Sequence, residues 1–273
     1  MDGGITMNPN TYPMITLTTD FGLRDEYVGL MKGVINSINP MVPIIDLTHH
    51  IPPQDVHWTS YLIYYSFQFF PAGSIHVIVV DPGVGSSRKI KLVKAGGHYF
   101  LCPDNGVISK VAGCCKPEEI WDINNTRYFL DDISSTFHGR DIFAPVAGHL
   151  SVGVKPELLG ERNRELFTFA LPEAVFLDSQ TIEGEIIHAD QFGNLITNIE
   201  EQMIRRLNTR YKEVVTEVAG QTITGISKSY IMVSDGTLLA TIGSKGLLEV
   251  SVNKGSAEAY LGVGKGALLR VKG

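Results

Sequence analysis

The sequence has no long hydrophobic run, no basic stretch and few charged residues. Its most apolar segment, residues 75–80, has the length of a strand and is far too short to span a bilayer. Lys and Arg number 23 against 29 Asp and Glu, so the net charge is −6, and the basic stripe of a nucleic-acid binder is missing. Residues 1–13 are polar and rich in Gly, Asn and Pro, unlike a signal peptide. We therefore expect neither a membrane nor a nucleic-acid partner.

Cysteine is scarce as well, with three residues in 273: Cys102, Cys114 and Cys115. An odd number that includes one adjacent pair is a poor framework for disulfides. No CxxC or Cys/His spacing indicates zinc. We expect buried or half-buried free thiols in a reducing compartment, and hence a cytoplasmic location.

Strand-like and helix-like segments alternate in the first half of the chain. The predicted strands are 14–19, 43–47 and 74–80, and the predicted helices are 25–38 and 54–70. A hairpin around Gly96-Gly97 is predicted for residues 89–103, a helix after Asn105, and another helix over 141–152. The alternation predicts an α/β N-terminal domain over residues 14–172, with a mostly parallel sheet.

The second half changes character, because turns of Gly, Asn and Asp separate short strands. These are predicted at 184–188, 195–198, 214–218, 222–226, 230–233, 238–242, 247–252 and 267–271, with one helix at 200–207. This pattern predicts an all-β C-terminal domain, a small barrel, over residues 180–273.

Two aspartates stand where predicted strands end. Asp20 follows the first strand and Asp81 follows the third, and each has a glycine two residues later. Ligands of open parallel sheets bind beyond the carboxyl ends of the strands. The two residues are therefore candidates for a functional site, although either could simply belong to a loop or a cap.

The segment 81–88 joins an acid to a base through a loop with two glycines. In the functional interpretation, Arg88 folds back to place a fixed positive charge beside Asp81. In the alternative, an ordinary ion pair between them braces a turn. A phosphate-cradling loop is disfavoured, because the GxxxxGK[ST] pattern is absent.

Two further segments carry polar side chains at turns. His138 lies just before a predicted helix that Asp141 could cap, and it becomes a catalytic candidate if it shares one sheet edge with Asp81 and Arg88. Asp190, Phe192 and Asn194 could read a nucleoside, because a carboxylate can accept from ribose hydroxyls and a ring can stack on a base. The same residues would also suit a plain turn or bulge.

These motifs, taken in order, resemble a known family. They are TLTTDFG (16–22), DEYVGLMKGVI (25–35), VDPGVGSSRK (80–89), PDNG (103–106), STFHGRDIFAPVAGHL (135–150) and DQFGNLITNI (190–199). Together they resemble the S-adenosyl-L-methionine hydroxide adenosyltransferases, relatives of the fluorinating and chlorinating adenosyltransferases. The resemblance extends over nearly the whole chain.

The resemblance implies cleavage of S-adenosyl-L-methionine to adenosine and L-methionine, with no cofactor and no metal. It implies a homotrimer with active sites at subunit interfaces. The implied catalytic set is Asp81, Arg88 and His138. The implied substrate-binding residues are Asp20, Phe21, Asn105, Asp190, Phe192, Asn194 and Ser244. The role of Lys245 stays open.

The implied chemistry is displacement at the ribose 5′ carbon, where methionine leaves as a neutral thioether and needs no general acid. The nucleophile is the difficulty, and Arg88 would stabilise hydroxide while Asp81 orients the water. His138 would either hydrogen-bond the water or accept its proton. The alternatives are a halide-using adenosyltransferase, a metal-dependent hydrolase built on Asp20, Asp81, His138 and Asp141, and a non-catalytic sensor of S-adenosylmethionine or adenosine.

Overall fold

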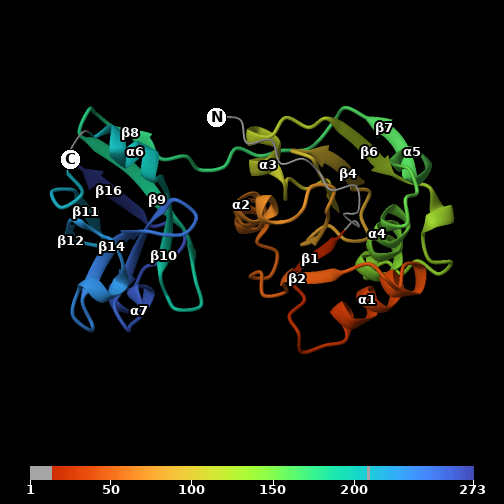
Figure 1. The fold of residues 1–273 in the computed structure, drawn as a ribbon, viewed down its shortest axis with the longest axis horizontal. Helices are drawn as coiled ribbons and strands as arrows, with labels where there is room; N and C mark the ends of the chain where they lie inside the picture. The colour runs from red at the N-terminus through yellow and green to blue at the C-terminus, as the bar shows by residue number, and fades with distance from the viewer. Residues whose placement is uncertain (1–13, 208–209) are drawn as a thin grey trace. The chain divides into compact units, whose positions relative to one another are not determined.

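The computed structural model describes residues 14–207 and 210–273. The chain divides into two compact units, Met1–Leu171 and Pro172–Gly273, each with its own hydrophobic core. Figure 1 labels helices and strands of both units. None of the helices in the described ranges has the length and apolar character needed to span a lipid bilayer.

The N-terminal unit is built on a seven-stranded sheet in the order β2-β1-β3-β5-β4-β6-β7. Its strands are β1 (Ile15–Thr19), β2 (Ile44–Thr48), β3 (Ile75–Val79), β4 (Ile90–Ala95), β5 (His98–Pro103), β6 (Glu119–Ile123) and β7 (Gly160–Asn163). The three pairings among β2, β1, β3 and β5 are parallel, and the three that join β5, β4, β6 and β7 are antiparallel.

The sheet is therefore mixed rather than mostly parallel, which corrects the expectation from the sequence. The reason is the predicted hairpin itself. Gly96 and Gly97 both adopt positive φ angles, so the chain reverses within a tight turn, and β4 pairs with β5 directly without a crossover helix. β6 then adds to the free side of β4 and continues the antiparallel half.

Helices cover both faces of this sheet. They are α1 (Tyr27–Ile38), α2 (Val56–Ser66), α3 (Ser109–Cys114), α4 (Ala144–Ser151) and α5 (Pro156–Leu159). α1 buries Val28, Met31 and Ile35, which share one side of the helix, and packs against α4. Ile15 and Leu17 of β1 face this layer, whereas Thr16 bonds to His76 on the opposite face, next to Phe67 at the end of α2.

The predicted helix at 141–152 begins earlier and less regularly than expected. A π-helical turn, Gly139–Phe143, follows His138 directly and runs into α4. Single π turns occur frequently at functional sites, because they displace side chains from the regular helical position. The irregular turn thus coincides with one of the predicted catalytic residues.

The C-terminal unit contains a nine-stranded sheet that is nearly barrel-shaped. Eight strands follow the order β12-β11-β16-β9-β10-β15-β14-β13, β8 pairs with β9, and β12 also approaches β14. The strands are β8 (Val175–Phe176), β9 (Thr181–Ala189), β10 (Leu195–Glu200), β11 (Val215–Val218), β12 (Gln221–Thr224), β13 (Ile226–Ser227), β14 (Leu238–Ile242), β15 (Leu247–Val252) and β16 (Leu268–Lys272).

Two expectations for this unit need correction. It contains the short helices α6 (Glu201–Arg206) and α7 (Ala257–Leu261), and only the first of these was predicted. The predicted strand at 230–233 is instead a 3-10 turn, Tyr230–Met232, whose side chains are exposed. The apolar residues there resembled a strand in the sequence, but they are not buried in a sheet.

All three cysteines are free thiols, as predicted. Cys102 is buried and Cys115 is half-buried, but Cys114 is exposed, which corrects the expectation that all three are at least half-buried. Burial raises the pKa of the Cys102 thiol well above its ordinary value, and it also raises that of Cys115. Both of these thiols therefore stay protonated and unreactive near neutral pH.

Candidate functional site

Asp20 and Asp81 leave the same edge of the N-terminal sheet. β1 and β3 are adjacent and parallel, and Thr19 lies opposite Val79 in their register. Asp20 follows β1 directly, and Asp81 stands two residues after β3. The shared edge follows from parallel pairing, since the carboxyl ends of such strands lie side by side.

The loop after β1 is held in place on both sides of Asp20. The Asp20 carboxylate accepts a hydrogen bond at 2.9 Å from the backbone N–H of Gln54, a non-glycine residue with a φ of 65°. Phe21 packs with Tyr27 and Phe137, with ring centroids 5.7 and 5.8 Å away. This aromatic cluster connects the Asp20 loop to the residue that precedes His138.

Asp81 and Arg88 form a two-point ion pair. Arg88 Nε donates to Asp81 Oδ1 at 2.6 Å, Nη2 donates to Oδ2, and Nη1 donates to the Lys89 carbonyl at 3.2 Å. The side chains of Arg88 and Asp81 are only 11% and 5% exposed. A guanidinium has five N–H groups, so two of them make no bond to the part of the chain that the structure describes.

His138 shares the electrostatic environment of this pair. Its pKa is lowered, first by burial of the ring and then by the positive charge of Arg88, while Asp81 and Asp141 act in the opposite direction. Its Nδ1 is buried and has no hydrogen-bond partner among the described residues. A neutral imidazole with an unpaired ring nitrogen is a potential proton acceptor.

A close approach of two loops links these three residues. Gly85 has a φ of 76°, and a Cβ at this position would collide with the carbonyl oxygen of Ser135. The backbone of the 81–88 loop therefore lies directly against the segment that leads to His138. Only glycine combines this backbone angle with the absence of a side chain.

Asn105 is tied to the backbone by both ends of its amide. Its Nδ2 donates to the Val80 carbonyl at 2.9 Å, and its Oδ1 accepts from the Val107 N–H at 3.2 Å. In the structure it therefore supports the residue before Asp81. Asp141, which the metal-dependent alternative requires, is fully buried, bonded to Arg140 Nε at 2.6 Å and to the Ser134 N–H at 2.8 Å.

Both carboxylate oxygens of Asp141 thus accept hydrogen bonds from neighbouring residues. Burial alone would raise its pKa, but the bonds from Arg140 and Ser134 hold the pKa below the usual value. Within residues 14–207 and 210–273, no group of three His, Cys, Asp or Glu side chains is arranged to hold a metal ion.

In the C-terminal unit, the predicted nucleoside residues form a rigid turn between β9 and β10. Asp190 Oδ1 accepts from the N–H groups of Phe192 and Asn194, and Oδ2 accepts from Asn194 Nδ2, each at 2.9 Å. The turn interpretation was therefore correct in geometry, and it does not exclude binding. The turn presents the Phe192 ring, which is 68% exposed.

A cavity of about 580 Å³ opens beside this turn. Its lining residues are Asp190, Phe192, Asn194, Tyr230, Val252, Asn253, Lys254 and Gly255. The volume lies within the range of small-molecule pockets. Tyr230 was not predicted as a site residue, because the apolar run that contains it resembled a strand. Ser244 is exposed in the turn between β14 and β15, where the Gly243 N–H bonds to the Leu247 carbonyl.

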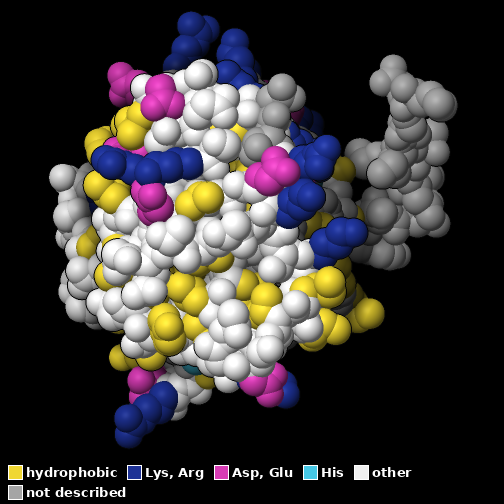
Figure 2. Space-filling view, turned by 90° about the vertical axis from the view of Figure 1, so that its left-hand side faces the viewer, with side chains coloured by type: hydrophobic (Ala, Val, Ile, Leu, Met, Phe, Trp, Pro, Cys, Tyr) yellow, Lys and Arg dark blue, Asp and Glu magenta, His cyan; other side chains and the backbone are white. Residues whose placement is uncertain are grey.

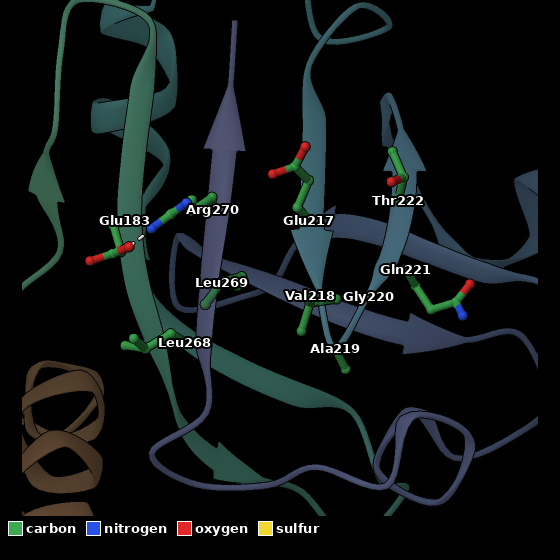
Figure 3. A pocket seen from close by; sticks show the side chains of 10 residues that line it. All are labelled: Glu183, Glu217, Val218, Ala219, Gly220, Gln221, Thr222, Leu268, Leu269 and Arg270. Carbon is green, nitrogen blue, oxygen red and sulfur yellow. Dashed lines mark hydrogen bonds and ion pairs between the residues drawn. The ribbon is translucent and has the colours of Figure 1, made fainter.

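A second groove of about 380 Å³ lies over β9, β16, β11 and β12 (Figure 3). It contains none of the predicted site residues. The charged side chains in the groove form ion pairs. Arg270 Nε lies 2.9 Å from Glu183 Oε2, and Glu217 Oε1 lies 2.7 Å from Nζ of the neighbouring Lys272. Nothing in this groove provides an unpaired charged group for chemistry.

Several large apolar side chains of the C-terminal unit are exposed, among them Phe192, Ile231, Met232 and Tyr260. Figure 2 shows a face of the molecule on which hydrophobic side chains lie among uncharged groups, with most of the charged side chains toward its margins.

Comparisons with known proteins agree with the motifs. A model described as the SAM hydroxide adenosyltransferase N-terminal domain matches residues 15–160, and the corresponding C-terminal domain model matches residues 184–270. A protein of Thermus thermophilus named (R)-S-adenosyl-L-methionine hydrolase is 33% identical, over 93% of this chain and 97% of its own. A fluorinase of an Actinoplanes species is 26% identical, over 76% and 78%.

The fold has a close counterpart among solved structures. A crystal structure from Thermotoga maritima, described as an uncharacterized conserved protein, superposes with a TM-score of 0.91 at 38% identity. The match covers 95% of this chain and 100% of that one. The two chains therefore share both units.

Proposed function

The chain belongs to the SAM hydroxide adenosyltransferase family, and from this premise we propose that it is a hydrolase of S-adenosyl-L-methionine. It cleaves this substrate to adenosine and L-methionine. The observation that carries the proposal is a nearly buried Asp81–Arg88 pair whose charges act on a His138 of lowered pKa. The hydrolase from Thermus is named for the (R) form, and we propose the same sulfonium epimer as the substrate here.

In the proposed mechanism, water attacks the ribose 5′ carbon and the bond from this carbon to sulfur breaks. Methionine leaves as a neutral thioether, so the step needs neither a general acid nor a metal or other cofactor. The two free N–H groups of Arg88 stabilise the charge that develops on the water oxygen. Asp81 fixes the guanidinium by its two-point bond.

We assign the proton of the water to His138. Its lowered pKa keeps the ring neutral at pH 7, and its unpaired Nδ1 is available to accept. The positive charge of Arg88 also repels the substrate sulfonium. That repulsion disappears as sulfur becomes neutral, which favours the transition state over the bound substrate.

Substrate binding is proposed for the remaining predicted residues. Asp20 accepts from the ribose hydroxyls, and Phe192 stacks on the adenine at the mouth of the 580 Å³ cavity. Asp190 and Asn194 form its polar wall, and Ser244 binds the methionine end. Phe21 and Asn105 are also proposed to line the substrate site, where the contact of Phe21 with Phe137 and the hydrogen bond from Asn105 to Val80 hold their loops in place.

We further propose that the two compact units are domains and that the chain acts in the cytoplasm as a homotrimer with active sites at subunit interfaces. The free thiols support the location, and the exposed apolar side chains support the assembly. A solution mass three times that of one chain is the expected result for the assembly.

The direct test of the function is incubation of the purified protein with S-adenosyl-L-methionine, followed by chromatography. Adenosine and methionine in equal amounts are expected. Unchanged substrate that raises the melting temperature would identify a sensor instead, because a bound ligand stabilises the fold without turnover. A 5′-halo nucleoside formed only with halide would identify a halide-using enzyme.

Substituting Gly85 by Ala should lower kcat by roughly 100-fold, because the new Cβ forces the 81–88 loop away from Ser135, and small displacements of reacting groups have effects of this size. Gly83→Ala is the matched control, since a Cβ there meets its neighbours at ordinary distances of 3.5 Å or more. Equal rates for both variants would contradict a role of this contact in positioning the site.

A further inference from the structure

Glu249 is a charged residue in an unusual place. It lies in β15 between Leu248 and Val250, which point into the core of the C-terminal unit. Because side chains alternate along a strand, Glu249 points to the opposite face. A carboxylate on that face would ordinarily be solvated, yet Glu249 is only 7% exposed. Burial of an acid has a cost, so its surroundings must compensate for it.

The compensation comes from Tyr230, which lines the cavity of about 580 Å³ beside Phe192. Because this cavity is proposed to hold the adenosyl group, we call it the nucleoside cavity. The Tyr230 hydroxyl donates to Glu249 Oε2 at 3.0 Å. Burial raises the pKa of Glu249, while this bond and the charge of Lys245 lower it. Burial and Glu249 together raise the pKa of Tyr230 to about 12, so the phenol keeps its proton and remains a donor near neutral pH.

The hairpin between β14 and β15 leaves space for this carboxylate. A Cβ at Gly243 would collide with Glu249 Oε1. The φ of Gly243 is not in the left-handed region, so the backbone does not require glycine there, and the need for it is steric. The carboxylate thus lies between the turn that carries Ser244 and the ring of Tyr230.

Tyr230 lies at an exposed turn and is itself 39% exposed. It begins the 3-10 turn Tyr230–Met232, in which Ile231 is 84% exposed and Met232 is 66% exposed. A ring on so exposed a turn would sample several rotamers, at an entropic cost each time a ligand ordered it. A bond to a buried carboxylate removes that freedom before binding.

We propose that Glu249 is a positioning residue that anchors Tyr230 as a preformed wall of the nucleoside cavity. The inference rests on the proposed function, since the cavity is taken to hold the adenosyl group. Glu249 touches no reacting atom and acts only through Tyr230. It therefore determines how tightly the nucleoside binds rather than how fast the bond to sulfur breaks.

The test is a double-mutant cycle with Tyr230→Phe and Glu249→Leu, which has no acceptor for the Tyr230 hydroxyl, measured by KM and kcat for S-adenosyl-L-methionine and by the Kd of adenosine. A hydrogen bond to a charged group stabilises enough for each single change to raise KM and Kd by roughly 10-fold. The kcat should change far less. The double variant should bind about as weakly as either single one, because both remove the same contact.

Two matched controls separate positioning from general destabilisation. Glu217→Gln removes a similar charge from the groove of Figure 3, where Glu217 pairs with Lys272, and it should leave KM unchanged. Gly243→Ala should reproduce the loss of affinity by displacing the carboxylate. Gly264→Ala, where a Cβ meets only an ordinary contact at 3.5 Å, should not.

The outcomes distinguish this inference from the function on which it rests. If the unchanged protein hydrolyses S-adenosyl-L-methionine, additive effects in the cycle or an unchanged KM in Glu249→Leu would overturn the positioning role alone. A fall in kcat at constant KM would also overturn it. A wild-type protein that neither cleaves S-adenosyl-L-methionine nor binds adenosine would contradict the proposed function and the inference together.

Discussion

Replacing Arg88 by Ala should lower kcat/KM for S-adenosyl-L-methionine hydrolysis by roughly 10²–10³-fold, the range for loss of one preorganised donor to a developing negative charge. The change removes the two N–H groups that make no bond to the described chain and the fixed charge beside the attacking water. Arg88→Lys should recover only part of the activity, since an ammonium cannot form the two-point bond to Asp81.

The main complication is stability, because Arg88→Ala leaves a nearly buried Asp81 carboxylate without its partner. Breaking a buried pair in this way costs about 3–5 kcal/mol of folding free energy. The double variant Arg88→Ala/Asp81→Asn removes the unpaired charge, and it should fold better and remain equally inactive. Arg162→Ala, which breaks an exposed pair with Glu119, is the control. Near-parental hydrolysis by either Arg88→Ala variant would exclude the proposed role of the guanidinium.

Substituting His138 by Ala should lower kcat/KM by about 10²–10⁴-fold, the usual contribution of a positioned general base. The matched control is His149→Ala. His149 is also half-buried with a pKa lowered by burial, but it packs edge-on against Tyr128 at 5.0 Å and takes no part in the proposed reaction. Equal losses in the two variants would indicate that His138 has only a packing role.

The pH profile distinguishes proton acceptance from mere orientation of the water. Burial and Arg88 lower the pKa of His138, so the neutral form persists below the ordinary histidine pKa of 6.5. Activity should therefore be constant through neutral pH and fall only when acid protonates the ring. Because Asp81 acts to raise this pKa, Asp81→Asn should move the acidic limb of kcat/KM to still lower pH. A limb that stays in place in Asp81→Asn would contradict this assignment.

The sequence predicted most elements of the fold, and its failures have identifiable physical causes. Periodicity located α1, whose buried side is visible as Val28, Met31 and Ile35. The Gly96-Gly97 turn indicated the β4–β5 hairpin, but the sequence could not show that β6 and β7 extend the antiparallel half, since pairing between strands distant in sequence is not a local property. The run at 230–233 has the composition of a strand, but whether such residues are buried is decided by the surrounding chain.

For the candidate site, sequence patterns indicated Asp81, Arg88 and His138, but they did not indicate which contacts hold these residues in place. The collision of Gly85 with Ser135 joins two segments some fifty residues apart, which no local pattern reveals. Glu249 was missed for a similar reason. Within the alternating pattern of β15 it resembled an ordinary solvent-facing residue, and the segments that cover it, around Gly243 and Tyr230, are not predictable from that pattern.

The most direct test of the account is hydrolysis in water enriched in oxygen-18, followed by mass analysis of both products. If water attacks the ribose 5′ carbon, adenosine carries one heavy oxygen and methionine carries none. Unlabelled adenosine, or label in methionine, would contradict the proposed displacement and the roles assigned to Arg88 and His138.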